Sequence, residues 1–184
     1  MSKTEKIVVV YRSKTGFTKN YATWLAKRLE CTLLEGDKVG LKELVEYDTI
    51  IYGSGLYASG ISGIKLITKN FEQLKDKRLI VFAVGASPNH KGIAEELIKT
   101  NIPPEQQGRI EFHYLRGGFD YNRLSPFYKV LMQLKKLQLK RIKNPDADTK
   151  GMLASYENPL DFTKEKNLEP ILRSLGQTMA ESAL

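Results

Sequence analysis

Short apolar runs alternate with amphipathic stretches along most of the chain. Runs rich in β-branched and aromatic residues predict strands, and apolar residues that recur every three or four positions predict helices. The predicted strands are Lys6–Tyr11, Cys31–Glu35, Asp48–Gly53, Leu79–Val84 and Arg109–Leu115. The predicted helices are Thr18–Leu29, Leu41–Glu46, Ser62–Leu74 and Gly92–Lys99, and a last helix lies within Leu168–Glu181. This alternation favours an α/β fold with a doubly wound, parallel sheet of five strands.

A long segment, residues 117–159, separates the fifth predicted strand from the last helix. It is too long for a plain loop in a compact domain. Within it, Ser125 is a suitable N-cap, Pro126 suits the first helical position, and Asn144–Pro145 ends the helix. We therefore expect residues 1–184 to form a single domain that carries an inserted basic helical segment at residues 117–159.

The inserted segment holds most of the charge. The chain has 29 basic and 21 acidic residues, a formal net charge of +8, and residues 116–143 contain eight basic residues and one acidic residue. Four lysines lie along one side of the predicted helix: Lys129, Lys136, Lys140 and Lys143. Three interpretations stay open: a helix docked on its own domain with a solvated basic edge, an amphipathic helix on an anionic membrane or partner surface, and, least favoured, nucleic-acid binding.

The composition favours a globular protein and argues against membrane-spanning, secreted and disulfide-bonded classes. The 184 residues are 41% hydrophobic and 27% charged, which suits one globular domain. The longest apolar runs fall well short of the roughly 20 residues that cross a bilayer, and the first residues do not form a secretory signal. The single cysteine, Cys31, excludes an internal disulfide, and His90 and His113 are not at metal-ligand spacing. We expect a cytoplasmic protein without a bound metal.

The turn after the first predicted strand has the composition of a phosphate site. Residues 13–18 read Ser-Lys-Thr-Gly-Phe-Thr and lead directly into a predicted helix. The amides of a helix N-terminus attract an anion, and the hydroxyls of Ser13, Thr15 and Thr18 can donate to phosphate oxygens. The alternative is an ordinary hydroxyl-rich turn with Thr18 as the N-cap. Dinucleotide binding is disfavoured, because the G-x-G-x-x-A match at residues 53–58 follows the third strand and no acidic residue ends the next.

Residues 8–18, VVVYRSKTGFT, resemble the flavodoxin signature. The resemblance implies the strand order 2-1-3-4-5 and a bound FMN whose phosphate is held by Ser13, Lys14, Thr15, Gly16, Phe17 and Thr18. It further implies two flavin-contacting loops, one after strand three and one after strand four. Their expected contact residues are Ser54, Gly55, Leu56, Tyr57, Gly85, Ala86, Ser87 and Asn89. Gly55 is expected to change conformation with the redox state of the flavin, and Tyr57 to stack on its ring or pack at the surface.

Three further segments resemble the bacterial menaquinone-dependent protoporphyrinogen oxidase family and its flavodoxin-domain relatives. They are residues 50–63, residues 116–142, and Tyr156 with the pair Asp161-Phe162. This resemblance implies an FMN-dependent oxidoreductase that passes electrons to a quinone or similar acceptor at the inner face of the cell membrane. The flavin would be the reacting group, and no side chain is assigned as catalytic.

Two alternatives stay open. One is a flavodoxin that only transfers electrons to a redox protein, although its usual acidic surface does not match the charge of +8. The other is a flavin-free binding module.

Overall fold

The computed structural model describes residues 5–57 and 59–177, and its centre is a parallel sheet. The five parallel strands are β1 (Ile7–Arg12), β2 (Thr32–Glu35), β3 (Thr49–Tyr57), β5 (Arg78–Gly85) and β6 (Ile110–Arg116). They lie in the order β2-β1-β3-β5-β6. When only the five parallel strands are numbered along the chain, this is the predicted order 2-1-3-4-5. The predicted fold class is therefore confirmed.

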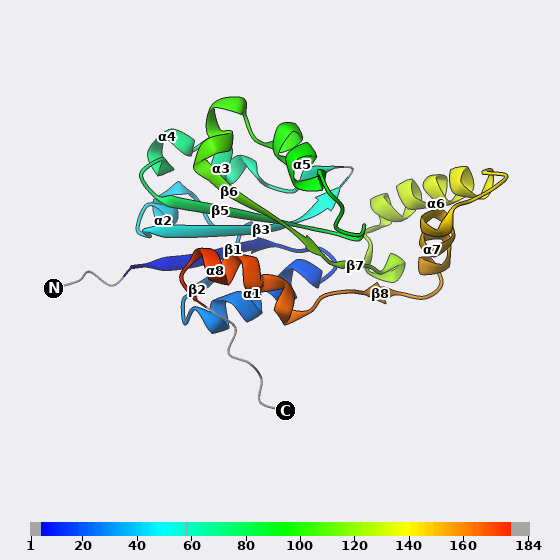
Figure 1. Cartoon of the computed structure of the whole chain (residues 1–184), viewed down its shortest axis with the longest axis horizontal. Helices are drawn as coiled ribbons and strands as arrows, with labels where there is room; N and C mark the ends of the chain where they lie inside the picture. The colour runs from blue at the N-terminus through cyan, green and yellow to red at the C-terminus, as the bar shows by residue number, and fades with distance from the viewer. Residues whose placement is uncertain (1–4, 58, 178–184) are drawn as a thin grey trace.

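Helices cover both faces of the sheet (Figure 1). One face packs against α1 (Phe17–Arg28) and α8 (Glu169–Ser174). The other packs against α2 (Leu41–Leu44), α3 (Lys65–Thr68), α4 (Phe71–Leu74) and α5 (Ile93–Asn101). Successive side chains of β1 point to opposite faces, so Val8 and Val10 join one core cluster while Val9 joins the other. Because β1 is buried on both faces, its sequence is continuously apolar and does not alternate between apolar and polar residues.

The prediction of a single continuous helix over Ser62–Leu74 is wrong. The structure has a short strand, β4 (Gly60–Ile61), followed by the separate helices α3 and α4. Asn70 lies between the two helices with non-helical backbone angles, and its side chain donates to the carbonyl of Leu66 at 2.8 Å. Asparagine competes in this way with the backbone hydrogen bonds of a helix. The apolar residues at helical spacing, Ile64, Ile67, Phe71 and Leu74, are nevertheless all buried.

Strand β3 runs four residues beyond its predicted end at Gly53. The extension pairs with β4 in an antiparallel hairpin, with Leu56 opposite Ile61 and Tyr57 opposite Gly60. Residues 54–57 were expected to be a loop and instead belong to the strand. Ala58, the last residue of the G-x-G-x-x-A match, lies outside the described residues.

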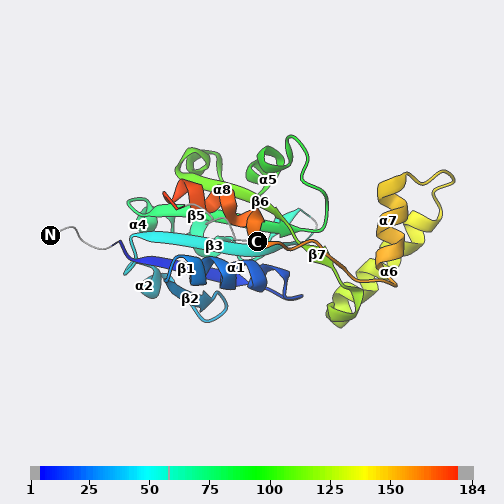
Figure 2. The same ribbon diagram turned by 60° about the horizontal axis from the view of Figure 1, so that its bottom comes forward.

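The inserted segment is a helical pair that projects beyond the carboxyl ends of the strands (Figures 1 and 2). It contains β7 (Gly118–Phe119), a 3₁₀ turn at Tyr121–Arg123, α6 (Pro126–Lys140), α7 (Ala147–Ser155) and β8 (Leu160–Asp161). Strands β7 and β8 pair with each other, so the two ends of the insertion meet. Helix α6 confirms the predicted helix, whereas α7 was not predicted.

The remaining elements are two further 3₁₀ turns, Pro104–Arg109 before β6 and Glu165–Leu168 before α8. Helix α8 lies within the range predicted for the last helix, and residues 178–181 of that range are outside the described part. No helix in the described part is both long and apolar enough to span a bilayer. The expectation of a single domain over residues 1–184 stays a prediction.

Candidate functional site

The turn between β1 and α1 is shaped by one glycine. Gly16 caps α1 in the left-handed region, with φ of 96°, where a side chain would be strained. Its N–H donates to Ser13 Oγ at 3.1 Å, which closes the turn. Helix α1 therefore begins at Phe17, one residue before the predicted start, and no side chain caps it. The alternative in which Thr18 is the N-cap is wrong, because Thr18 lies inside the first turn.

This turn opens onto a cavity of about 620 Å³ at the carboxyl ends of β1, β3 and β5. The volume is within the roughly 300–1,000 Å³ typical of cofactor sites. The sheet side of the cavity contains nine of the residues predicted to bind the flavin. They are Lys14, Thr15, Phe17, Thr18, Gly55, Leu56, Tyr57, Gly85 and Ala86. Three segments far apart in sequence thus meet at one edge of the sheet, as the resemblance implied.

Five other predicted residues lie around the cavity without lining it. Ser13 and Gly16 form the turn itself, as described above. Ser54 is fully buried within β3, where it belongs to the sheet interior. Ser87 and Asn89 are exposed beyond the end of β5, and Asn89 lines a different cleft. The candidate contacts with the flavin are therefore the turn at residues 13–18, called the phosphate turn below, and the ends of β3 and β5.

Glycine at position 85 allows β5 to pack closely beneath the cavity. A Cβ there would lie 2.7 Å from Tyr114 Oη and 3.1 Å from Leu56 Cδ1. Position 55 is different, because a Cβ would be in ordinary contact with the Tyr57 ring at 3.5 Å and with Thr18 Oγ1 at 3.7 Å. A methyl group at position 55 would therefore fit between the Tyr57 ring and Thr18 without a clash, at the wall of the cavity.

The far wall of the cavity comes from the inserted segment. Eleven of the 21 lining residues belong to it, most of them on α6. They are Gly118, Phe119, Asp120, Leu124, Tyr128, Leu131, Met132, Leu134, Lys135, Gln138 and Met152. The sequence analysis left open whether the helix docks on its own domain or on a partner surface, and it did not predict that the insertion forms a wall of this cavity. The spacing of Tyr128, Leu131, Leu134 and Gln138, which places them on one helix face, is the signal that pointed to it.

Lys14 and two tyrosines join the phosphate turn to the insertion. The rings of Tyr57 and Tyr128 have centroids 4.9 Å apart. Lys14 Nζ lies 4.8 Å from the Tyr57 centroid, 4.4 Å from the Tyr128 centroid and 3.4 Å from Tyr128 Oη. Such cation–π contacts hold the ammonium group beside the cavity. Burial raises the pKa of Tyr57 to about 12, so its phenol stays protonated at neutral pH.

A second contact holds the turn from outside. Arg123 of the insertion donates from Nη1 to the carbonyl of Thr15 at 3.1 Å. The same guanidinium forms an ion pair with Asp120 at 3.2 Å. The insertion therefore contacts the phosphate turn at two places, through Arg123 and through Tyr128.

The sequence profile of the flavodoxin domain matches residues 8–146 of the chain. The chain belongs to this family. The chain is also similar to three solved structures. A flavodoxin, WrbA-like protein from Agrobacterium tumefaciens is 23% identical over 61% of this chain and 84% of its own, with a TM-score of 0.43. The Trp repressor binding protein of Bacillus subtilis is 21% identical over 61% and 83%, with a TM-score of 0.45. The flavodoxin of Megasphaera elsdenii is 13% identical over 59% and 84%, with a TM-score of 0.42. No curated protein matches the chain.

Family membership identifies the cofactor of this flavodoxin domain as FMN, which confirms the prediction. The residues present fit that cofactor. The hydroxyls of Thr15 and Thr18 and the first-turn amides of α1 face one end of the cavity, where a terminal phosphate would bind. Apolar and aromatic side chains around Leu56 and Tyr57 provide the surface that a flat ring system requires.

Proposed function

We propose that this flavodoxin domain is an FMN-dependent oxidoreductase with a substrate of its own, similar in activity to the protoporphyrinogen oxidase family. Electrons would pass from an organic substrate to a quinone or similar acceptor at a membrane surface. Bound FMN supplies the redox chemistry, and the protein binds, orients and encloses the reacting molecules. The observation that carries this proposal is the wall that the insertion adds to the cavity.

An electron carrier needs an exposed flavin edge, whereas a substrate needs an enclosed and shaped space beside it. In this flavodoxin domain α6 provides such a space, because Tyr128, Leu131 and Leu134 face the cavity opposite the ends of the strands. These apolar side chains suit a large planar organic molecule. Lys14 and Lys135 also line the cavity and would pair with an anionic group on the substrate.

The outer surface of α6 supports the membrane part of the proposal. Among the described residues, six of the seven exposed large hydrophobic side chains belong to α6 or to the turn after it. This exposed apolar strip consists of Phe127, Val130, Leu131, Leu134, Leu137 and Ile142, with exposed fractions from 45% to 72%. A contiguous apolar strip of this kind marks an interaction site.

The lysines that sequence analysis placed on one side of the helix divide into two pairs in the structure. Lys129 and Lys136 are half-buried against the insertion itself, with their Nζ atoms 5.9 Å from the Tyr121 ring centroid and 5.0 Å from the Tyr156 ring centroid, respectively. Lys140 and Lys143 are exposed. We propose that the part of this strip outside the cavity, Phe127, Val130, Leu137 and Ile142, meets an anionic membrane, with Lys140, Arg141 and Lys143 near the headgroups. Each such cation contributes about 1 kcal/mol at an anionic surface.

The test of an enzymatic function is anaerobic oxidation of protoporphyrinogen IX by the FMN-loaded protein with a water-soluble menaquinone analogue. Leu134→Gln and Leu137→Gln form a matched pair on α6, because their side chains are 55% and 56% exposed and only Leu134 lines the cavity. We expect Leu134→Gln to raise KM for the substrate, and Leu137→Gln to leave it unchanged.

The alternative function, electron transfer without a substrate, predicts a different result. The protein would then be reduced and reoxidised by artificial mediators but would not consume protoporphyrinogen IX or transfer its electrons to the quinone analogue. Equal kinetics for the two leucine variants would likewise contradict a substrate site beneath α6.

A further inference from the structure

A second cleft, of about 850 Å³, lies along the carboxyl half of β6. Its walls are the loop after β5, the carboxyl half of β6, and the segment that leads from the insertion into α8. No residue lines both the cleft and the flavin cavity. The cleft is therefore a separate site, which neither the cofactor nor the proposed substrate occupies.

The charges in this cleft are unbalanced. Arg116, Lys164 and Lys166 line it, and none of the three forms an ion pair with another described residue. Glu169 is the acidic residue of the lining, and it is paired with Arg173. Three cations that share one concave surface repel one another, and a bound anion would relieve that repulsion.

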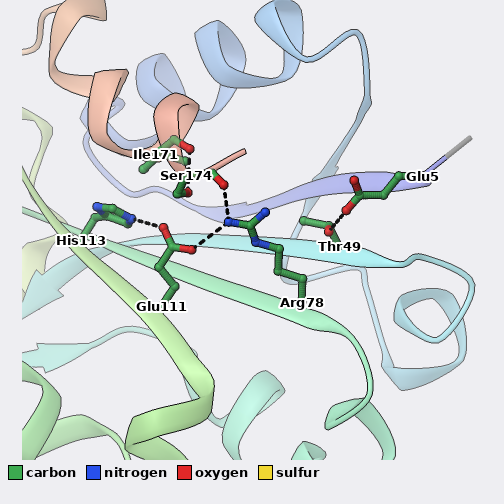
Figure 3. Close-up of polar contacts among 7 residues, drawn as sticks. All are labelled: Glu5, Thr49, Arg78, Glu111, His113, Ile171 and Ser174. Carbon is green, nitrogen blue, oxygen red and sulfur yellow. Dashed lines mark hydrogen bonds and ion pairs between the residues drawn. The ribbon is translucent and has the colours of Figure 1, made fainter. Parts of the chain in front are cut away.

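A nearby carboxylate does not compensate these cations. Figure 3 shows Glu111 of β6 between His113 and Arg78, with contacts of 2.7 Å to His113 Nε2 and 3.2 Å to Arg78 Nη2. Arg78 also donates to the carbonyl of Ser174 at 2.6 Å, which ties the end of α8 to the sheet. Glu111 is thus engaged by a network of its own at the sheet edge.

Arg116 has the geometry of an anion-binding arginine. Its guanidinium carbon lies 3.6 Å from the ring centroid of Phe162, so the group stacks closely on the aromatic ring. Its Nε is buried and has no hydrogen-bond partner among the described residues. A guanidinium stacked on a ring keeps its N–H groups free at its edge, where a carboxylate or phosphate can accept two hydrogen bonds. The buried Nε is closed off from the cleft, so a ligand there would be held through the terminal Nη groups of Arg116.

We propose that this cleft binds an oxyanion group, carboxylate or phosphate, of a small polyanionic molecule. Arg116 holds the oxyanion by paired hydrogen bonds, and Lys164 and Lys166 neutralise its remaining charge. The site adjoins the flavin cavity, because Arg116 lies opposite Gly85 in the sheet and the N–H of Gly117 donates to the Gly85 carbonyl at 2.7 Å. The ligand would therefore be bound one strand away from Gly85, which lines the flavin cavity.

The test is isothermal titration calorimetry of the FMN-loaded, full-length protein at low ionic strength. Two probes are titrated separately, tricarballylate for a carboxylate ligand and inorganic pyrophosphate for a phosphate ligand. We expect saturable binding of at least one probe at one site per chain, and the tighter probe identifies the source of the oxyanion. Absence of saturable binding of either probe below about 10 mM would overturn the proposal.

Variants show whether binding occurs in this cleft. Arg116→Gln should weaken binding at least about tenfold, since a charge-assisted pair is lost. Arg116→Lys should restore only part of it, because a lysine cannot form the paired hydrogen bonds. The double variant Lys164→Gln/Lys166→Gln alters two exposed side chains without touching the stacked guanidinium, and it should also weaken binding about tenfold.

The matched control is Lys99→Gln, because Lys99 is an exposed lysine of α5 outside the cleft. It should change the dissociation constant less than twofold. If Lys99→Gln weakens binding as much as the cleft variants do, the probes respond only to the net charge of the protein and the site assignment is wrong. The FMN content of each variant, read from its absorbance, should equal that of the wild type.

Discussion

Removal of two hydroxyl groups from the phosphate turn should sharply reduce the affinity for FMN. The variants are Thr15→Val and Thr18→Val, each replacing a hydroxyl with a methyl group of similar size. Thr18 is 3% exposed, so valine keeps its packing in the first turn of α1 while Oγ1 is lost. Both side chains line the cavity, and the hydrogen bond that Arg123 makes with Thr15 uses the backbone carbonyl and not the hydroxyl. The hydroxyls are therefore available to a phosphate.

The expected size follows from the charge of the phosphate. A hydrogen bond to a charged group contributes about 1.5–3 kcal/mol, and about 1.4 kcal/mol corresponds to a tenfold change in affinity. Each variant should therefore weaken FMN binding at least about tenfold. The affinity of the double variant for FMN should fall about 10²-fold or more. This is less than the full sum of the upper single values, because both hydroxyls bind one phosphate and their effects need not add fully.

The assay is titration of FMN-free protein into a fixed concentration of FMN, followed by the quenching of flavin fluorescence. Thr100→Val is the control, since Thr100 is an exposed threonine of α5 whose hydroxyl donates to the Glu96 carbonyl, far from the turn in sequence. Thermal unfolding of the FMN-free variants checks that the fold is intact. If Thr15→Val/Thr18→Val keeps its affinity within threefold of the wild type, the phosphate binds elsewhere and the assignment of the turn is refuted.

Four further results are expected. Gly55→Ala should shift the midpoint potential of the bound flavin in a redox titration while FMN affinity falls less than in the threonine variants, because its Cβ lies at the wall of the cavity beside the Tyr57 ring; unchanged potentials would contradict a flavin contact there. Gly53→Ala should lower stability by about 1–3 kcal/mol in calorimetry, since its Cβ would lie 1.9 Å from Phe82 Cζ, and an unaltered Tm would argue against this packing. Lys140→Glu/Lys143→Glu should reduce sedimentation with anionic liposomes at low salt and spare FMN content; wild-type protein that stays in the supernatant would exclude the membrane proposal. Burial raises the pKa of the Cys31 thiol to about 11, so the thiolate forms only as the pH rises toward that value. Alkylation of Cys31 by iodoacetamide at pH 8 should therefore be much slower than alkylation of a free thiol, and a rate equal to that of glutathione would disprove the raised pKa.

The strands and the turn at residues 13–18 could be predicted because both depend on local patterns, whereas the order of the strands came from the resemblance to flavodoxins. Each β-branched run is long enough to be a strand, and the turn at residues 13–18 follows the first strand without interruption. The break at Asn70 could not be found from apolar spacing, since the side chains of both short helices still point into one core cluster. Helix α7 gave no periodic signal either, because its sequence ADTKGMLAS contains Gly151 and lacks an apolar face.

The role of the insertion depends on tertiary structure. The sequence of α6 shows which residues share a helix face, but it does not show which face meets the sheet. Lys129 and Lys136 pack inward against tyrosines of the insertion, while Leu134 and Leu137 stay exposed. Apolar residues of a surface helix usually face inward, and in α6 two lysines share the inner side with the partly buried Met132 and Leu139. An expectation built on that rule therefore assigned the lysines to the outer surface.

The pairing of β7 with β8 makes the inserted segment a unit that begins and ends at one place on the core sheet. The insertion leaves and re-enters the flavodoxin core at one point, where Gly118 lies so close to β8 that a Cβ would be 2.1 Å from the Leu160 carbonyl oxygen. Residues between these two short strands can be replaced or shortened without altering the register of any core strand. The insertion also contacts the turn at residues 13–18, through Arg123 and Tyr128. Exchange of this self-contained hairpin would therefore change the far wall of the cavity and the support of that turn together, while the core sheet is inherited unchanged.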